Sequence, residues 1–231
     1  NHKEINKNIK IIKKLSSTPV LVGFGVKSKK DVKSLNEKTL KEFIQNDTFK
    51  KYLIDSIQYS LRTFKSKLKR SDYVNGFVRY EKYTRKDVFR LLNWEQNPIA
   101  QNVGGYMVSR DNRDCAIYVT YKKAEKITET TRYEDAFINQ EIFTYKSKSK
   151  RTMASREVKL ISSQKENNIR LPLFLKKSDD EGISHYYMGE LFIIEDSVKQ
   201  EYMKDGKVPV VTFSFTIDKP VEENLYKYIT S

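Results

Sequence analysis

The apolar residues of this 231-residue chain change their spacing near Ser71, and this change constrains the fold more than any other feature. Before it, from Phe49 to Leu68, apolar side chains recur every three or four residues, as on one face of a helix. Further along, apolar and polar residues alternate in short runs, as in half-buried strands. The sequence therefore predicts a helical region over 1–70 and a β-rich domain over 71–231.

The helical region contains shorter segments before its long helix. Residues 1–15 predict a short amphipathic helix, and residues 36–45 have a helical composition. Thr48 is a residue type that can cap the long helix. The apolar stretch 19–26 contains two glycines and fits either a strand or a buried loop. A helical region this small needs a partner for its apolar stripe.

Pairs of β-prone runs joined by turn-rich segments predict hairpins in the rest of the chain. The paired runs are 105–109 with 116–121, and 169–177 with 186–194; single strands are expected at 143–146 and 208–217, and helices at 84–93, 153–162 and 220–229. The helix at 84–93 has Thr84 and Asp87 at capping-box spacing. Strands outnumber helices and most connections are antiparallel, so the expected class is α+β: a helical connector followed by an antiparallel β-barrel, open or closed, with flanking helices.

The charge balance indicates a polyanionic partner. Lysines and arginines number 44 against 30 acidic residues, a net charge of +14. Nucleic acid is the leading interpretation and an anionic membrane surface the second, while a lysine-rich proteome would give the same composition without any partner. The run 146–151, followed by Arg156 and Lys159, is typical of a phosphate-contacting loop. The run 65–70 is more typical of a solvated helix end.

Catalytic and metal-binding constellations are scarce. Cys115 is the single cysteine and His2 and His185 are the two histidines, which excludes a disulfide framework and a cysteine-based zinc site within one chain. No glycine-rich phosphate loop and no bilayer-spanning apolar run is present. Cys115 and His185 are expected to be buried structural residues, residues 179–181 to form a turn, and Gly104-Gly105 to mark a turn or a close backbone approach. We expect no catalytic residue, metal or cofactor in this fragment.

The segment 132–146 carries the most informative pattern. Tyr133 and Tyr145 lie twelve residues apart, and Glu134 and Asp135 directly follow the first tyrosine. Two flat rings can sandwich a flipped base, a carboxylate can accept hydrogen bonds from the exocyclic amine of cytosine, and nearby cations can hold the distorted backbone. Ordinary core tyrosines beside a loop fit the same residues, and the spacing alone favours that second interpretation.

The pattern resembles the base-binding region of SRA domains, which flip 5-methylcytosine between two tyrosines and read its pairing edge with an aspartate. The resemblance implies that Tyr133 and Tyr145 stack on the base, and that Asp135, with Glu134 behind it, reads the edge. The family's reading aspartate lies three residues after the first tyrosine, where this chain has Ala136. The family's Gly-Ser-Gly-Gly after the second tyrosine is replaced here by the basic run.

Further residues of the site follow from this resemblance. The phosphate-binding side chains would be those of the basic run, Lys146, Lys148, Lys150 and Arg151. Tyr118 and Tyr121 are three residues apart in a predicted strand and therefore face opposite sides of it. Of these two tyrosines, Tyr121 is expected to line the pocket.

Six motifs lie between residues 79 and 195: Tyr83-Thr-Arg-Lys-Asp-Val-Phe-Arg-Leu-Leu-Asn-Trp94, Ile117-Tyr-Val-Thr-Tyr121, Tyr133-Glu-Asp135, Lys148-Ser-Lys-Arg151, Pro172-Leu-Phe-Leu-Lys-Lys-Ser-Asp179 and Tyr186-Tyr-Met-Gly189. Together they resemble the C-terminal domain of SauUSI-like type IV restriction enzymes, where it follows phospholipase D-type nuclease and superfamily 2 helicase domains. The resemblance implies an SRA-like modified-base-binding domain over 71–231 and a connector over 1–70.

The same resemblance implies the partners. They are double-stranded DNA carrying modified cytosine, and the helicase and nuclease domains of the same parent chain, with ATP and magnesium needed only by the absent helicase part. A bacterial cytoplasmic location is implied, and the polar start without a signal-peptide core suits an excised fragment. Two alternatives stay open: a metal-dependent nuclease built from the carboxylates, and a basic domain that docks DNA or protein without preference.

Overall fold

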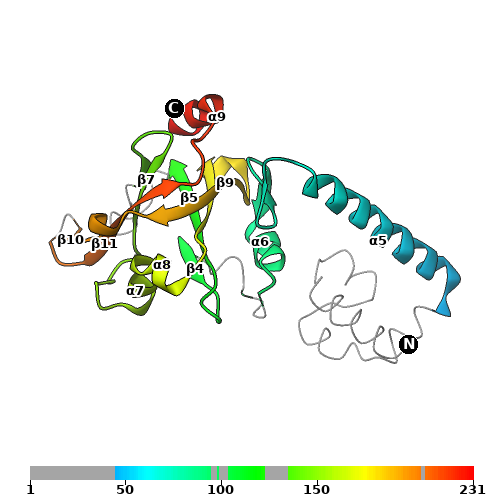
Figure 1. Cartoon of the computed structure of the whole chain (residues 1–231), viewed down its shortest axis with the longest axis horizontal. Coiled ribbons are helices and arrows are strands. Elements are labelled where there is room, and N and C mark those ends of the chain that lie inside the picture. The colour runs from blue at the N-terminus through cyan, green and yellow to red at the C-terminus, as the bar shows by residue number, and fades with distance from the viewer. Residues whose placement is uncertain (1–44, 95–97, 99–103, 123–134, 204–205) are drawn as a thin grey trace. The chain divides into compact units, whose positions relative to one another are not determined.

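The computed structural model has the element order drawn in Figure 1. It describes residues 45–94, 98, 104–122, 135–203 and 206–231. Contacts divide the chain into two compact units, residues 1–71 and residues 72–231, which are described separately. The expected helix at 1–15, the stretch 19–26 and all of 36–45 except its last residue lie outside the described residues, as do Tyr133 and Glu134.

The long helix of the first unit is α5, Asp47–Leu68. Its N-cap is Asn46, whose Oδ1 accepts a hydrogen bond from the Phe49 N–H at 2.9 Å. Thr48 lies inside the first turn, so the expectation that it caps the helix is wrong. Asn46 takes that place because its side-chain oxygen reaches an N–H three residues ahead that has no partner within the helix.

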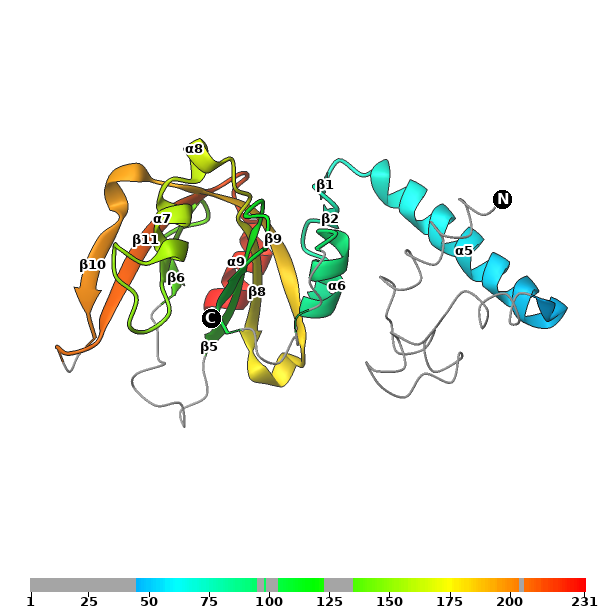
Figure 2. The same ribbon diagram turned by 90° about the horizontal axis from the view of Figure 1, so that it is seen from below.

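The second unit is built on one sheet, seen from two sides in Figures 1 and 2. Its main path runs β4 (Tyr106–Val108), β5 (Cys115–Lys122), β8 (Pro172–Ser178), β9 (Ser184–Ile193), β11 (Pro209–Ile217), β7 (Ile142–Lys146) and β6 (Ala136–Phe137). Off this path, β10 (Lys199–Tyr202) pairs with β11 and β3 (Lys82–Thr84) pairs with β9, while β1 (Tyr73–Val74) and β2 (Phe77–Val78) form a separate ribbon.

The α+β class with a mainly antiparallel sheet is confirmed, and the structure adds two details. The pairing of β5 with β8 is parallel, because the chain between them forms β6, β7 and two helices and then crosses back, where a hairpin would reverse direction. Among the described residues, the end strands β4 and β6 do not pair with one another, so the sheet is open and is not a closed barrel.

The helices of this unit are α6 (Arg85–Leu91), α7 (Arg156–Ser162), α8 (Gln164–Asn167) and α9 (Glu223–Thr230). The predicted capping box of α6 is confirmed: the Asp87 N–H donates to Thr84 Oγ1 at 3.2 Å, and the Thr84 N–H donates to Asp87 Oδ2 at 3.3 Å. The helix expected from 153 starts only at Arg156, because the Thr152 N–H donates to Ser155 Oγ at 3.0 Å and closes a turn before it.

Strand β5 divides the core into two clusters. Ile117 and Val119 point into a large cluster with the inner residues of β7, β8 and β11, whereas Tyr118 points into a second, mainly aromatic cluster. Successive side chains of a strand face opposite sides, so a strand covered on both faces reads as one apolar run. Helix α7 lies near the start of β5, where Arg156 bonds Asn112, and α9 lies near its end, where Lys122 Nζ donates to the Ser231 carbonyl oxygen. Figure 1 draws α7 and α8 below β5 and α9 above it.

An ion pair between a buried arginine and a partly buried aspartate joins an early and a late segment of this unit. Arg79, which is 5% exposed, pairs through Nη2 with Asp218 Oδ2 and donates from Nη1 to the Met188 carbonyl oxygen. Asp218 Oδ1 also accepts the Glu190 N–H at 3.1 Å. The pair occupies the space beside Gly189, where a Cβ atom would collide with both side chains and where φ is +131°. Glycine is therefore required at this position of β9.

The buried histidine leads to a pH prediction. His185 is 1% exposed, and burial together with the positive charges of Arg85 and Lys176 lowers its pKa from 6.5 to about 3. Below pH 6.5 the unfolded chain takes up a proton that the folded chain does not. The free energy of unfolding should therefore fall as the pH falls from about 6.5 towards 3, by at most about 1.4 kcal/mol per pH unit.

Urea unfolding between about pH 7 and pH 5.5, above the range where carboxylates titrate, measures this slope. His185→Leu should flatten it, and His2→Gln, which changes the only other histidine, should leave it intact. A slope that survives in His185→Leu would show that another group is responsible.

Candidate nucleic-acid interface

Tyr145 projects inward from β7. The strand alternates, with Phe143 and Tyr145 buried and the residues between them partly exposed. The Tyr145 ring is 2% exposed and meets the Tyr106 ring edge-on, with centroids 6.1 Å apart. One of the two predicted stacking rings is thus packed in the core, and its predicted partner Tyr133 lies outside the described residues.

Gly105 makes room for the Tyr145 hydroxyl group. A Cβ atom at Gly105 would lie 2.6 Å from Tyr145 Oη, and φ at Gly105 is +67°. Both facts favour glycine, because real Cβ atoms do not come that close to an oxygen and side chains rarely adopt that conformation. The close backbone approach expected of the Gly104-Gly105 doublet is confirmed at its second residue.

Asp135 lies next to Tyr145. Strands β6 and β7 pair with Ala136 opposite Thr144, and the same register continued by one residue sets Asp135 opposite Tyr145. Asp135 is 9% exposed, and its Oδ1 accepts the Lys146 N–H at 3.0 Å. A carboxylate removed from water in this way must be held by hydrogen bonds. One predicted stacking ring and one predicted base-reading carboxylate therefore lie side by side, while Glu134 lies outside the described residues.

Tyr121 and Tyr118 occupy opposite sides of β5, as predicted. The Tyr121 ring is half-buried and stacks on Phe137 of β6, with centroids 6.5 Å apart and planes 25° apart. Tyr118 stacks on Phe174 in the aromatic cluster, on the other face of the sheet. Tyr121 is therefore the tyrosine of this strand on the Tyr145 side of the core.

The four cations of the basic run have four different environments. Lys146 lies 3.7 Å from Glu201, and Arg151 is paired with Glu157. Lys148 is half-buried, with Nζ 4.6 Å from the centre of the Tyr106 ring, and burial lowers its pKa. Lys150 is exposed, adopts φ +63°, and forms no ion pair with any described residue. Lys150 is thus the most accessible of the four for a phosphate.

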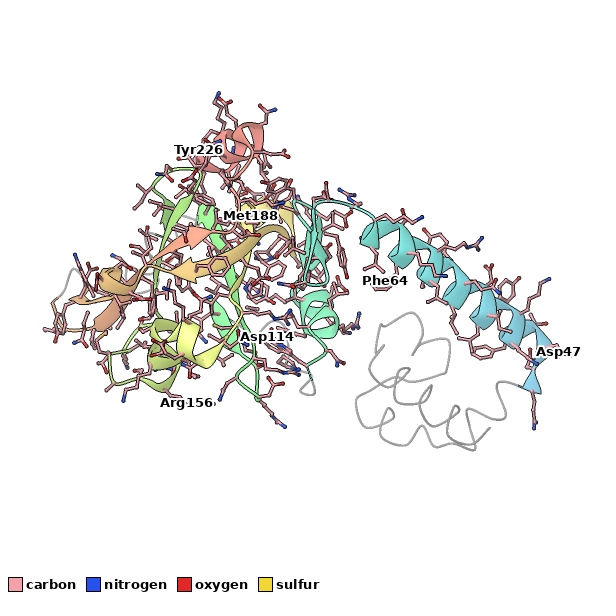
Figure 3. All side chains as sticks on the ribbon, viewed as in Figure 1. Asp47, Phe64, Asp114, Arg156, Met188 and Tyr226 are labelled. Carbon is pink, nitrogen blue, oxygen red and sulfur yellow. The ribbon has the colours of Figure 1, made fainter. Side chains whose placement is uncertain are left out.

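The polar segment of the β4–β5 hairpin lies against α7. Arg156 Nη2 donates to Asn112 Oδ1 at 2.7 Å, which places the hairpin beside the end of the basic run. Asp114 faces the other way and is buried, accepting from Trp94 Nε1 at 3.0 Å and from Arg170 Nε at 2.7 Å. Figure 3 labels Asp114 and Arg156. Arg156 extends the cationic surface beyond residue 151.

The residues considered for catalysis are buried in the core or lie in a turn. Cys115 is fully buried and burial raises the pKa of its thiol to about 12, and His185 is also buried, as predicted. Residues 179–181 form the expected turn, in which Asp179 pairs with Lys176 at 2.9 Å. No three His, Cys, Asp or Glu side chains cluster as metal ligands within the described ranges.

No helix of the part that can be described is long and apolar enough to cross a bilayer.

Tyr106 is the residue of this region that the sequence pattern did not single out. It contacts both Tyr145 and Lys148, and burial raises its pKa. The sequence signal for this region was the Gly104-Gly105 doublet directly before Tyr106. A glycine that allows a close backbone approach implies that a bulky side chain packs against it.

A double-mutant cycle tests the contact between Gly105 and Tyr145. Gly105→Ala should lower the free energy of unfolding by roughly 1–2 kcal/mol for the left-handed backbone and by about 1–3 kcal/mol for the clash. In a Tyr145→Phe background the second contribution should disappear, because the hydroxyl oxygen is gone. Urea unfolding of wild type, Gly105→Ala, Tyr145→Phe and the double variant measures the backbone cost and the cost of the clash separately.

Gly104→Ala is the matched control, since no atom lies within 4 Å of its Cβ position, and its cost should be small. An equal cost of Gly105→Ala in both backgrounds would show that the hydroxyl group is not the obstacle.

Comparison with solved structures finds SRA domains, at low similarity. The SUVH5 SRA domain in complex with hemimethylated CG DNA is 12% identical, with a TM-score of 0.43 over 66% of this chain and 96% of that chain. The sulfur-binding and SRA domains of ScoMcrA with phosphorothioated DNA are 6% identical, with a TM-score of 0.39 over 67% and 45%. Arabidopsis thaliana SUVH6 with SAM is 15% identical, with a TM-score of 0.42 over 68% and 30%.

These similarities are remote, with TM-scores below 0.5. No curated protein matches the sequence. A family model, in contrast, matches residues 77–229, which is most of the chain and nearly all of its second unit. The chain therefore belongs to the DUF3427 family, which is described as a domain of unknown function.

Proposed function

We propose that this chain binds duplex DNA and recognises 5-methylcytosine by flipping the base into a pocket built around Tyr145 and Asp135. The observation that carries the proposal is the register of β6 and β7, which sets a buried carboxylate opposite an inward tyrosine. Tyr133 would supply the second ring and Glu134 a neighbouring carboxylate, as the SRA resemblance implies. Tyr121 would line the side of the pocket near Phe137.

The chemistry of Asp135 suits cytosine. Cytosine presents an amine donor at the position where thymine presents an oxygen acceptor. A carboxylate in water-poor surroundings accepts from the amine and repels the oxygen, which distinguishes the two pyrimidines. The flat ring of Tyr145 supplies stacking of about 1–3 kcal/mol per base, against an unstacking cost of a few kcal/mol.

Base entry requires a rearrangement around Tyr145. Its ring is 2% exposed, so no face is open to a base in the structure as it stands. Tyr106 contacts the ring and Lys148 lies over Tyr106, so these two side chains would have to shift as the base enters. Lys148 is already partly desolvated, and phosphates brought close by the DNA would stabilise its charge in an outward position.

The wider role that we propose is target recognition within an ATP-dependent type IV restriction endonuclease. It rests on the six motifs between residues 79 and 195, which resemble the end of SauUSI-like enzymes. The nuclease and helicase domains would belong to the same parent chain and would use the ATP and magnesium, and the complex would act in the bacterial cytoplasm. This chain itself would be a binding module and not an enzyme.

Binding of two labelled duplexes that differ only in one 5-methylcytosine tests the proposal. Wild type should prefer the methylated duplex, and Asp135→Asn should weaken its binding by roughly 5- to 150-fold, the equivalent of about 1–3 kcal/mol for one base-reading contact. Tyr145→Leu should abolish the preference, because stacking is lost. Tyr118→Leu is the matched control, since Tyr118 is equally buried but lies in the other cluster.

Each other outcome identifies an alternative. Equal affinity of wild type for both duplexes at matched salt would indicate a basic domain without modification preference. Cleavage of either duplex with Mg²⁺ or Mn²⁺ would indicate a nuclease. A preference that survives in Tyr145→Leu, with circular dichroism showing a folded protein, would place the pocket elsewhere.

Lys150 leads to a separate prediction about the DNA backbone. Lys150→Gln should weaken binding to the methylated and the plain duplex alike, because a phosphate contact carries no base information. The slope of log affinity against log salt should become shallower by about 0.9 for one phosphate. Lys219→Gln, which removes another exposed lysine of the same unit, is the control. A change in the methyl preference would mean that Lys150 acts on the pocket.

A further inference from the structure

The positive charge of the chain is concentrated in the first unit. Residues 1–71 hold 18 lysines and arginines against 6 acidic residues, a net charge of +12. Residues 72–231 hold 26 against 24, a net charge of +2. The unit that contains the candidate base pocket is therefore nearly neutral, although it is the larger of the two.

A lysine-rich background does not explain this difference. Such a background would raise the lysine content of both units and leave each with a similar balance. Here the second unit offsets nearly every cation with an acid, and the first does not. Charge of one sign concentrated in one part of a chain is a signature of a surface for a polyanion.

Helix α5 shows how part of this charge is arranged. Lys51, Arg62, Lys65 and Lys69 follow one another at steps of 11, 3 and 4 residues, which are close to whole helical turns. They therefore share one face, which also carries Gln58 and two acids, Asp47 and Asp55. The apolar residues Leu53, Ile57, Phe64 and Leu68 lie on the opposite side.

These cations are available to a partner. Lys51, Arg62, Lys65 and Lys69 are all exposed, and none of them forms an ion pair with a described residue. Figure 3 shows side chains projecting from both sides of α5 between Asp47 and Phe64.

Helix stability accounts for only some of the cations. The negative end of the helix dipole favours Lys65 and Lys69 near the C-terminus of α5. Lys51 lies one turn into the helix, where Asp47 and Asp55, each four residues away, stabilise it. Arg62 lies in the middle of the helix, with no acid three or four residues away, so neither the dipole nor a neighbouring acid accounts for it.

We propose that α5, with its C-cap residue Lys69, forms a second DNA-binding surface, in which the cationic face of the helix contacts backbone phosphates regardless of sequence or modification. Arg62, Lys65 and Lys69 span about 10 Å along the helix axis, and Lys51 extends the row to about 27 Å. Duplex DNA carries a charge about every 1.7 Å of its axis, so several phosphates lie within reach of such a row. This surface adds salt-dependent affinity to that of Lys150, while the second unit supplies the choice of base.

The choice of DNA as the polyanion rests on the proposed function of the second unit. A basic amphipathic helix also fits an anionic membrane surface, where the apolar face would enter the lipid. Duplex DNA is already the proposed ligand of the second unit, so we take it as the polyanion here, and membrane binding is the alternative that the experiment must separate.

The test uses the full chain with Lys51, Arg62, Lys65 and Lys69 all changed to glutamine, a residue that retains helix propensity. Affinity for a plain duplex is measured by fluorescence anisotropy over a range of salt concentrations. The slope of log affinity against log salt should become shallower by about 0.9 for each phosphate that the variant no longer neutralises, which is up to about 3.6 for four. The ratio of affinities for methylated and plain duplexes should stay unchanged.

A second variant carries the same loss of charge in the other unit. It changes four exposed lysines, Lys165, Lys199, Lys219 and Lys227, to glutamine. An equal change of slope in this control would show that only the net charge matters and would overturn the proposal. An unchanged slope in the α5 variant would overturn it too.

Vesicles containing phosphatidylserine form the last arm. Loss of vesicle binding in the α5 variant, with duplex affinity intact, would assign the surface to a membrane and overturn the proposal. In a further outcome, wild type binds methylated and plain duplexes equally while the α5 variant still shows a shallower slope of log affinity against log salt. That result would contradict the proposed base recognition and support the proposed phosphate-binding face of α5. The two proposals are therefore tested separately.

Discussion

The pair between Arg79 and Asp218 links the start of the second unit to the end of β11, the strand that pairs with β7 of the candidate site. Burying two charges is costly unless their remaining hydrogen-bonding capacity is also met. Here Arg79 also bonds the Met188 carbonyl oxygen and Asp218 also accepts the Glu190 N–H, which meets part of that capacity, while Arg79 Nε has no hydrogen-bond partner among the described residues. The pair thereby fixes the end of β11 against β9. Strand β11 in turn pairs with β7, with Phe213 opposite Tyr145, so the ion pair acts on a strand that borders the candidate pocket.

The local features of the fold were predictable from the sequence, and its long-range pairing was not. The capping box of α6 and the two hairpins depend on residues close together in the chain, and their signals are local. The parallel pairing of β5 with β8 depends on a crossover that no local pattern encodes. The N-cap of α5 could not be predicted exactly, because Asn46 and Thr48 are both residue types that cap helices. The cap is Asn46 because the helical backbone starts at Asp47.

The candidate site divides in the same way. The twelve-residue spacing of the tyrosines and the carboxylates after the first of them were visible in the sequence, and the structure sets Asp135 opposite Tyr145. The surroundings of the cations were not visible. Glu157 neutralises Arg151 because a turn brings α7 back to the basic run, and Lys148 folds over Tyr106, which comes from a distant strand. The four cations of the basic run therefore differ in how accessible they are to a phosphate.

The burial of Tyr145 has a consequence for how recognition is measured. Under the proposed function, a base enters only those molecules in which the ring is uncovered, and these are a minor population of the free protein. The observed affinity is then the intrinsic affinity multiplied by that population. An opening free energy of about 1.4 kcal/mol would weaken binding about tenfold, equally for every base that enters. Modest affinity would thus be compatible with high discrimination, because the cost of opening cancels from the ratio between two bases.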